Sequence, residues 1–443
     1  MRMTRRYEPL LLAALTACPA SDDAAKATTQ ATPTTSAMGT QGGTAAPPTG
    51  ATQAADESGD DGTPLALSFV EIAVEGDLAL TTGFAFVPGT MDLLALSKSG
   101  QVDHLRIAGD EAERLGGFTL PGVYSDLDCG LLSVAFDPDY ARNHFVYLGT
   151  CISQTHSAVY RVTFDGSDYE SVAPSAAEII RVGDDAAPKP WHNVGSLGFD
   201  VSGNLWALFG DKRISAHGQD TTNELSGLIR IIPNRDPDGS GHEPAPGNPF
   251  ADVRGASPDL VAYGLRSPWR GVYDAQGRWW FGDVGANGFE EINIVSSPGQ
   301  NFGWANHEGP CEASCDDVTE PVLSWPHEGT HQYQIDDPDV SPTNARVAWV
   351  GAEYTAATVD QYDGELTGTV LFGDYCLGFV RGATVNNAGE VTSDRPLGHL
   401  RFPTAWREGA DGFLYVTTFG KCETAGLDED DPPASGLFRV VAQ

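Results

Sequence analysis

The sequence predicts an all-β protein and, within that class, a six-bladed β-propeller. Three observations lead to this prediction. Short β-rich runs recur along residues 65–443, polar turns join them in pairs, and long helical periodicity is scarce. The 51 glycines and 29 prolines fit a chain with many turns, and 41% hydrophobic residues are enough for a sizeable core. A pair of β-sandwiches is the alternative architecture for the same pattern.

The N-terminus has the pattern of a bacterial lipoprotein leader. Arginines at positions 2, 5 and 6 precede a short apolar run at 10–15, and the sequence Leu-Thr-Ala-Cys then ends at Cys18. This apolar run is too short to cross a bilayer as a helix. We therefore expect residues 1–18 to be a signal peptide and Cys18 to carry the lipid. Pro19 in place of an aspartate after Cys18 favours the outer membrane.

The next segment, residues 19–64, consists mostly of Ala, Thr, Ser, Gly and Pro with scattered Asp. Such a composition cannot bury enough apolar surface to offset the entropy lost on ordering. We expect a disordered tether that holds an exported domain at the bacterial envelope, on its periplasmic or surface face. The lipid anchor would then be the only membrane contact.

From residue 65 onward, the repeated unit is an apolar strand, a polar turn and a second apolar strand, which is typical of a β-hairpin. The copies recur at irregular intervals, which favours propeller blades with inserted loops over a tight solenoid. Ring closure also explains how so many short strands avoid open edges. Five such units lie at 84–96, 134–148, 197–208, 271–281 and 406–416, and one additional strand lies at 369–372. Together they suggest six blades.

Six cysteines remain once Cys18 is set aside, and an even number in an exported domain suggests three disulfides. Two pairs are close in sequence, and elimination leaves the third. The preferred pairing is Cys129 with Cys151, Cys311 with Cys315, and Cys376 with Cys422. Free structural thiols are the alternative.

The formal net charge is −35 and the isoelectric point is near 4.4. A chain this acidic repels phosphate backbones, so nucleic acid is excluded as an expected partner. The charge itself indicates a well-solvated surface and says nothing about the fold.

One stretch carries a family resemblance. Residues 262–270 read Ala-Tyr-Gly-Leu-Arg-Ser-Pro-Trp-Arg and resemble the Y-G-x-R-N-P segment of the PQQ-dependent glucose/sorbosone dehydrogenases. The order of the following motifs is similar to the branch that this family shares with the hedgehog-interacting protein propeller. The matching segments lie at 130–136, 191–195, 282–287, 290–293, 301–304, 308–309 and 371–376.

The resemblance implies a set of site residues. His192 stands where relatives keep the base that removes a proton from the sugar's anomeric hydroxyl, and an imidazole with a near-neutral pKa suits that task. Arg266 matches the arginine beside the cofactor quinone, and Ser267 and Arg381 are further cofactor-binding candidates. The expected cofactors are PQQ, which carries the redox chemistry, and Ca²⁺. The calcium ligands would be main-chain oxygens of Gly285 and Ala286, with the Glu291 carboxylate at a second site.

The residues themselves leave other roles open. His192 fits equally well as a loop histidine whose polar atoms are hydrogen-bonded within the fold, and Arg266 as a buried structural arginine bonded to loop carbonyls. The chain also departs from the family. Ser196 replaces an arginine or glutamine, and Ser267 replaces an asparagine. The segment 371–378 lacks the basic residues that pair with the PQQ carboxylates. Cations from other blades are the possible substitutes: Arg213, Arg346, Arg381 and Arg401.

Two motifs suggest other chemistry. His327-Glu328-Gly329-Thr330-His331 matches the zinc-protease pattern H-E-x-x-H, but that chemistry needs a helix, and Pro326 and Gly329 argue against one. Residues 236–241 look like a calcium loop, and we expect a turn instead because no distant glutamate follows. No glycine-rich dinucleotide loop opens a helix.

We therefore expect a cell-envelope quinoprotein that oxidises the C1 hydroxyl of an aldose or a related sugar, with PQQ as hydride acceptor. The sequence does not identify the electron acceptor. The alternative is a non-enzymatic propeller lipoprotein that binds glycans or proteins through its loop face, because one fold hosts many functions.

Overall fold

The structure is a computed structural model. It describes residues 65–443 except 77, 312–314, 316, 330, 334–345 and 421–434. The expected signal peptide, Cys18 and the tether at 19–64 lie outside the described residues. Within the described part of the chain, no helix has the length and apolar character needed to span a bilayer.

The strands form six sheets, each of which is one blade of a propeller. Blade 1 contains β3 (Thr81–Phe86), β4 (Asp92–Ser97), β5 (Gln101–Ala108) and β6 (Glu111–Thr119), with β2 (Ala73–Val74) beside β6. Blade 2 contains β7 (Leu131–Phe136), β8 (Phe145–Cys151), β9 (His156–Thr163) and β10 (Ala177–Gly183). Blade 3 contains β11 (Val194–Phe199), β12 (Leu205–Phe209), β13 (Gly227–Pro233), β14 (His242–Pro244) and β15 (Leu260–Tyr263).

The remaining blades follow the same order. Blade 4 contains β16 (Pro268–Tyr273), β17 (Trp279–Asp283), β18 (Phe289–Val295) and β19 (Leu323–Pro326). Blade 5 contains β20 (Ala348–Tyr354), β21 (Thr369–Asp374), β22 (Phe379–Val385) and β23 (Val391–His399). Blade 6 contains β24 (Pro403–Glu408), β25 (Leu414–Thr418) and β26 (Gly436–Ala442), and its outer strand is β1 (Leu67–Glu71) from the start of the domain.

Helical structure in the described residues is limited to short turns between strands. These are α1 (Tyr140–Asn143), α2 (Tyr169–Val172) and two 3₁₀ turns at Ala173–Ser175 and Ser215–Gln219. The predicted hairpins coincide with the first two strands of five blades, and the additional strand predicted at 369–372 is β21.

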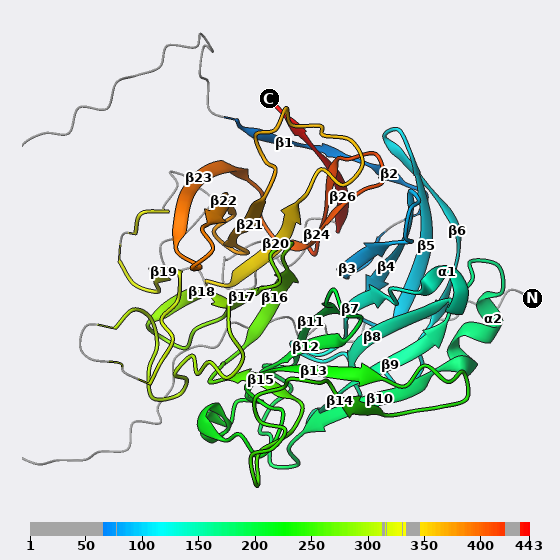
Figure 1. The fold of residues 1–443 in the computed structure, drawn as a ribbon. Coiled ribbons are helices and arrows are strands. Elements are labelled where there is room, and N and C mark those ends of the chain that lie inside the picture. The colour runs from blue at the N-terminus through cyan, green and yellow to red at the C-terminus, as the bar shows by residue number, and fades with distance from the viewer. Residues whose placement is uncertain are drawn as a thin grey trace, which may run out of the picture. The chain divides into compact units, whose positions relative to one another are not determined.

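The innermost strands close a ring. Each innermost strand contacts the next one, in the order β3, β7, β11, β16, β20 and β24, and β24 in turn contacts β3 (Figure 1). The pairing of β1 with β26 places the start of the domain in the blade that also holds its end. The prediction of a six-bladed all-β propeller is therefore confirmed, and the ring leaves no inner strand with an open edge.

The core is divided among the gaps between blades. Each of six clusters of buried apolar side chains contains residues from two neighbouring blades. Between blades 5 and 6, for example, Trp349 stacks on Trp406 with ring centroids 5.3 Å apart. Burial of large aromatic side chains in these gaps supplies the main stabilisation that holds neighbouring blades together.

All six blades share one arrangement where the chain enters the innermost strand. The first residue of that strand pairs with the last residue of the second strand in five blades, as in Val194 with Phe209 and Pro268 with Asp283, and with the next-to-last residue, Thr150, in blade 2. The backbone amide of the residue that follows this pair on the second strand then donates to the carbonyl of the residue just before the innermost strand, as Gly210 does to Asn193. Equivalent residues therefore meet at one end of the ring. We call the residue two places before each innermost strand its lead position; these are Ala79, Cys129, His192, Arg266, Arg346 and Arg401.

Two of the three predicted disulfides are confirmed. Cys129 is bonded to Cys151, with Cα atoms 5.4 Å apart, and Cys311 is bonded to Cys315, with Cα atoms 6.3 Å apart. For the predicted pair of Cys376 with Cys422, Cys422 lies outside the described residues, so this pairing stays a prediction.

Candidate active site

His192 occupies the lead position of blade 3 and is buried. Its Nδ1 lies 2.5 Å from Oδ1 of Asp211, which follows β12 in the same blade. The backbone amide of Arg213 donates to the same oxygen over 2.6 Å, and Trp304 Nε1 donates to Oδ2 over 2.8 Å. Both carboxylate oxygens are therefore held by donors, and the imidazole orientation is fixed by Asp211.

The electrostatics of this pair favour a neutral imidazole. Burial lowers the pKa of His192, the nearby Arg266 lowers it further, and Asp211 opposes these two effects only in part. Burial alone would raise the pKa of Asp211, but the hydrogen bonds from His192 and Trp304 and the nearby charge of Arg266 together outweigh burial and lower this pKa. With Nδ1–H donated to Asp211, His192 Nε2 is the basic atom. It has no hydrogen bond to any described residue and is not sealed from solvent, as a general base requires.

Arg266 lies beside this pair at the lead position of blade 4. Its carbonyl accepts the Asp211 amide over 2.9 Å, and its guanidinium lies 5.5 Å from the Trp304 ring. Nη1 donates to the Val284 carbonyl over 2.8 Å. The structure thus brings His192 and Arg266 together, and the hydrogen bond to Val284 leaves other donors of the guanidinium for a ligand.

Ser267 and Asp283 fix the backbone at this point. The amides of Arg266 and Ser267 donate to the two oxygens of Asp283, over 2.9 and 2.7 Å. Burial, with a smaller contribution from Glu291, raises the pKa of Asp283 well above its usual range. Ser267 is therefore adjacent to the site, and its backbone contact positions Arg266.

The next two lead positions are also arginines. Arg346 in blade 5 is buried, and its Nε and Nη1 have no hydrogen-bond partner. Arg401 in blade 6 is half-buried, and its Nε and Nη2 are likewise without a partner. Arg213, next to Asp211 and Lys212, places its guanidinium 4.1 Å from the Trp191 ring. None of these guanidiniums forms an ion pair with a carboxylate of the described chain.

Most arginines on the blades' outer strands and surface instead pair with acids, as Arg230 does with Asp200 and Arg439 with Asp110. Arg161 on β9 is an exception, because backbone carbonyls hold its guanidinium. Orphaned guanidinium donors are costly when buried and are strong partners for carboxylates. The arrangement therefore fits a ligand with several carboxylates at the mouth formed by the lead positions.

The segment 371–378, which lacks basic residues, does not present a free acid to this mouth. Asp374 is fully buried, and the amides of Val347, Cys376 and Leu377 and the indole of Trp325 all donate to it. Burial raises its pKa to about 7. Asp374 is thus a backbone anchor within this segment.

Arg381 lies elsewhere in the same blade. It is on β22, and its Nε donates to Asp394 Oδ1 on the outer strand β23 over 2.7 Å. Its guanidinium also lies 4.8 Å from the Tyr333 ring. The structure does not bring Arg381 together with His192 and Arg266, so its role as a cofactor ligand is left without geometric support.

The segment predicted to hold calcium is shaped by carboxylates. Glu308 Oε1 accepts the amides of Ala286, Gly288 and Phe289 over 2.6, 3.2 and 3.3 Å. Gly285 donates to Glu290. Glu291 accepts the Gly309 amide over 2.6 Å, and burial raises its pKa. Gly285, Ala286 and Glu291 therefore lie in one acidic cluster, whose oxygen atoms are of the type that calcium accepts.

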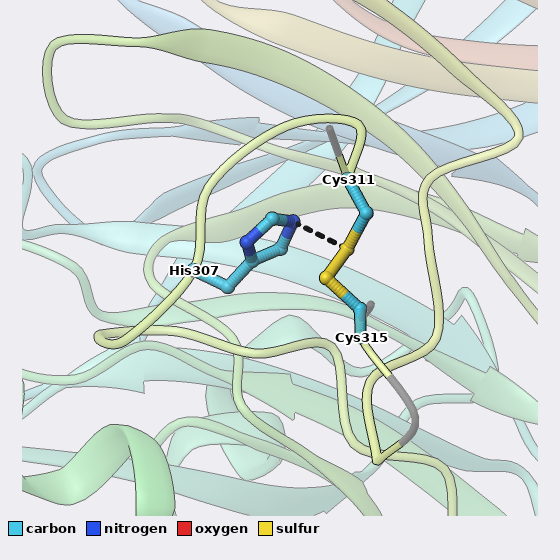
Figure 2. A group of neighbouring side chains, drawn as sticks. All are labelled: His307, Cys311 and Cys315. Carbon is cyan, nitrogen blue, oxygen red and sulfur yellow. Dashed lines mark hydrogen bonds between the residues drawn. A yellow bond between two sulfur atoms is a disulfide. The ribbon is translucent and has the colours of Figure 1, made fainter. Parts of the chain in front are cut away.

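The loop that carries Trp304 and Glu308 also contains a disulfide with a histidine beside it. Figure 2 shows His307 beside the disulfide of Cys311 and Cys315, with Nε2 3.3 Å from Cys311 Sγ. These three side chains are close enough to surround a metal ion. Both sulfurs are used in the disulfide, however, so the group offers a metal only the imidazole, and we assign it a structural role.

The structure also resolves the two misleading motifs. His327 Nε2 pairs with Glu290, and the described residues of the H-E-x-x-H segment form no helix. In the loop at 236–241, Arg161 donates to the carbonyls of Asp236, Pro237 and Gly239. A guanidinium already fills this loop, which confirms the predicted turn.

Sequence reasoning missed Asp211, Trp304 and Glu308 as site residues. One signal for Asp211 was present, because the triplet Phe-Gly-Asp recurs at 209–211, 281–283 and 372–374. Asp283 and Asp374 end their strands, whereas Asp211 lies two residues beyond the end of β12. This offset brings Asp211, and not its two counterparts, to His192.

Comparisons with known proteins agree with this geometry. Residues 78–421 match the family described as Glucose / Sorbosone dehydrogenase. The chain is 27% identical over 367 residues to aldose sugar dehydrogenase YliI of Escherichia coli, covering 75% of this chain and 85% of that one. It is 30% identical over 239 residues to the HIPL1 protein of Arabidopsis thaliana, covering 42% and 34%.

Among solved structures, the fold is similar to the PQQ-bound aldose sugar dehydrogenase of Streptomyces coelicolor. The TM-score is 0.64 at 21% identity, over 86% of this chain and 98% of that one. The likeness in fold and the match over most of the propeller lead to one conclusion. The chain belongs to the glucose/sorbosone dehydrogenase family.

Proposed function

We propose that the protein is a quinoprotein that oxidises the C1 hydroxyl of an aldose or a related sugar. The observation that carries the proposal is the mouth of the ring, where the pair of His192 and Asp211 faces arginines that lack carboxylate partners. A relative solved with PQQ has the same fold. PQQ has three carboxylates, which is the ligand chemistry that such arginines bind.

The residues available to hold PQQ are Arg266, Arg346, Arg401 and Arg213, with the Trp191 indole as a further buried donor that has no partner. When bound, PQQ supplies the two-electron acceptor for the hydride that leaves C1 of the sugar. His192 Nε2 takes the hydroxyl proton, and Asp211 stabilises the imidazolium that forms. Arg266 supplies fixed positive charge next to this position.

Calcium held by main-chain oxygens of Gly285 and Ala286, with a second ion at the Glu291 carboxylate, is part of this proposal. The acidic cluster around these residues, with the raised pKa of Glu291, would be stabilised by a divalent cation. Export and a lipid anchor at Cys18 are also proposed. The leader pattern supports them, as do the two disulfides, which form in oxidising compartments.

The test combines binding with turnover. PQQ is titrated calorimetrically into the calcium-loaded protein, and aldose-dependent dye reduction is measured for wild type and His192→Ala. The control is His242→Ala, since His242 makes a similar pair with Asp259 over 2.8 Å in the outer part of blade 3. We expect tight PQQ binding by all three proteins and loss of turnover only in His192→Ala. Absence of PQQ binding would refute the proposal and leave the non-enzymatic binding propeller.

A further inference from the structure

The ring contains a second polar site, deeper than the mouth. A small cavity lies between the innermost strands of blades 3 to 6, which places it on the axis. Its lining includes Ser196 of β11, Arg270 of β16, Trp349 of β20, and Thr404 and Arg407 of β24. No residue of the mouth described above lines it. This cavity is therefore distinct from the proposed PQQ site.

Arg270 crosses the ring to reach this cavity. Its Nε donates to the Thr404 carbonyl in blade 6 and its Nη2 to the Thr82 carbonyl in blade 1, each over 2.5 Å. Only 7% of the residue is exposed. Arg270 thus joins three blades, and part of its guanidinium borders the cavity without a carbonyl partner.

Arg407 faces the same space from blade 6. The hydrogen bond of its side chain runs from Nη1 to the Trp406 carbonyl over 2.7 Å, which leaves most of the guanidinium donors unused. Within the described residues, no carboxylate forms an ion pair with Arg270 or Arg407. Burial lowers the pKa of Arg407 to about 10, and burial with repulsion from Arg407 lowers that of Arg270 to about 9. Two cations, the buried Arg270 and the half-buried Arg407, therefore share one small space with no counter-charge from the described residues.

Two neighbouring buried cations repel one another, and each pays the cost of leaving water. An anion between them would remove the repulsion and accept the unused donors. The free space admits a particle about the size of one water molecule. A monatomic anion suits a space of this size. We propose that the cavity binds a monovalent halide, with chloride as the physiological ion, between Arg270 and Arg407.

The first test measures thermal unfolding without PQQ. Chloride is raised against gluconate at constant ionic strength, so that general screening is the same in every sample. A ligand that binds only the folded state raises the unfolding midpoint with its concentration. We expect this rise for wild type and its loss in Arg407→Met, which keeps the length of the side chain and removes the charge. The control Arg381→Met, which breaks a pair on the outer strands, keeps the chloride response.

The second test does not depend on any variant folding. Wild-type crystals grown in bromide should show an anomalous peak between Arg270 and Arg407. A bromide peak together with a chloride-specific gain in stability supports the proposal. Crystals without bromide density in the cavity, or equal stability in chloride and gluconate, would overturn it. Neither result depends on whether the protein binds PQQ.

Discussion

Replacing Asp211 with asparagine preserves the shape of the side chain beside His192 but changes what its outer atoms can accept. In the wild type, both carboxylate oxygens accept hydrogen bonds: Oδ1 from His192 Nδ1 and the Arg213 amide, and Oδ2 from Trp304 Nε1. An amide offers one acceptor oxygen and one donor nitrogen. Neither of its two orientations can satisfy all three donors.

Each orientation has a defined consequence. If the amide nitrogen faces Trp304, two donors oppose each other in a buried site, at a cost of about 1–3 kcal/mol. If it faces His192, the imidazole must carry its proton on Nε2 and can no longer act as a base. The carboxylate charge is lost in both cases. Because a general base contributes about 10²–10⁴-fold, we expect kcat to fall by about that factor.

The pH profile distinguishes this role from simple loss of stability. Burial holds the pKa of His192 below its ordinary value of 6.5, and Asp211 partly raises it. The acid limb of kcat/KM, where the base becomes protonated, should therefore lie below pH 6.5 in the wild type. It should move to still lower pH in Asp211→Asn, because the group that favours the protonated form is gone.

The assay is dye-coupled sugar oxidation across the acid range, with thermal unfolding measured on the same samples. Asp137→Asn is the matched control, because Asp137 is equally buried and accepts hydrogen bonds from Asn143 and Arg235 just after the end of β7, away from the mouth. It should lose stability and keep its profile. If the maximal kcat is unchanged in Asp211→Asn, or if the acid limb of kcat/KM moves to higher pH, the role assigned to Asp211 is refuted.

Three further predictions concern stability. Burial lowers the pKa of Lys212 from 10.5 to about 7, so the unfolded chain binds more protons between these values and the wild type should gain stability as pH rises through them. Urea unfolding of Lys212→Met should lack this gain. In Gly285→Ala, the new Cβ would lie 1.8 Å from the Phe289 carbonyl oxygen, so the unfolding midpoint should drop by several degrees; an unchanged midpoint would show that the loop adapts freely. Removing the disulfide in Cys129→Ser/Cys151→Ser should cost about 3 kcal/mol in urea unfolding, as expected for a closed loop of this length. A loss well below 1 kcal/mol would mean that the bond contributes little to the fold.

The hairpins were predictable because their signal is local. In the unit at 197–208, an apolar run, a Ser-Gly-Asn turn and a second apolar run are adjacent in sequence, and β11 and β12 form on either side of that turn. The disulfide of Cys311 with Cys315 was predictable for the same reason. Outer strands such as β10 and β23 carry more polar residues, and pairing with their blade determines them more than their own pattern does.

The site was only partly predictable because ring closure assembles it. His192 and Arg266 were found through motifs, whereas Asp211 and Trp304 lie 93 positions apart in sequence and meet only in the folded ring. The sequence offered Arg213, Arg346, Arg381 and Arg401 as equal substitutes for the missing basic residues. The repeated backbone geometry separates them, because it brings Arg346 and Arg401 to lead positions and leaves Arg381 on β22, paired with Asp394 of the outer strand β23.

The distribution of charge connects the mouth and the deeper cavity. With a net charge of −35, the chain has ample carboxylates, and most of its outer arginines pair with them. The arginines along the axis do not, although a nearby acid would relieve the cost of burying them. An acid placed there would also occupy the donors that an incoming carboxylate or halide needs. Unpaired cations on the axis therefore lower the stability of the empty ring, but they also leave its guanidinium donors available for an anion. The loss of stability is thus the cost of a site that is preorganised for binding.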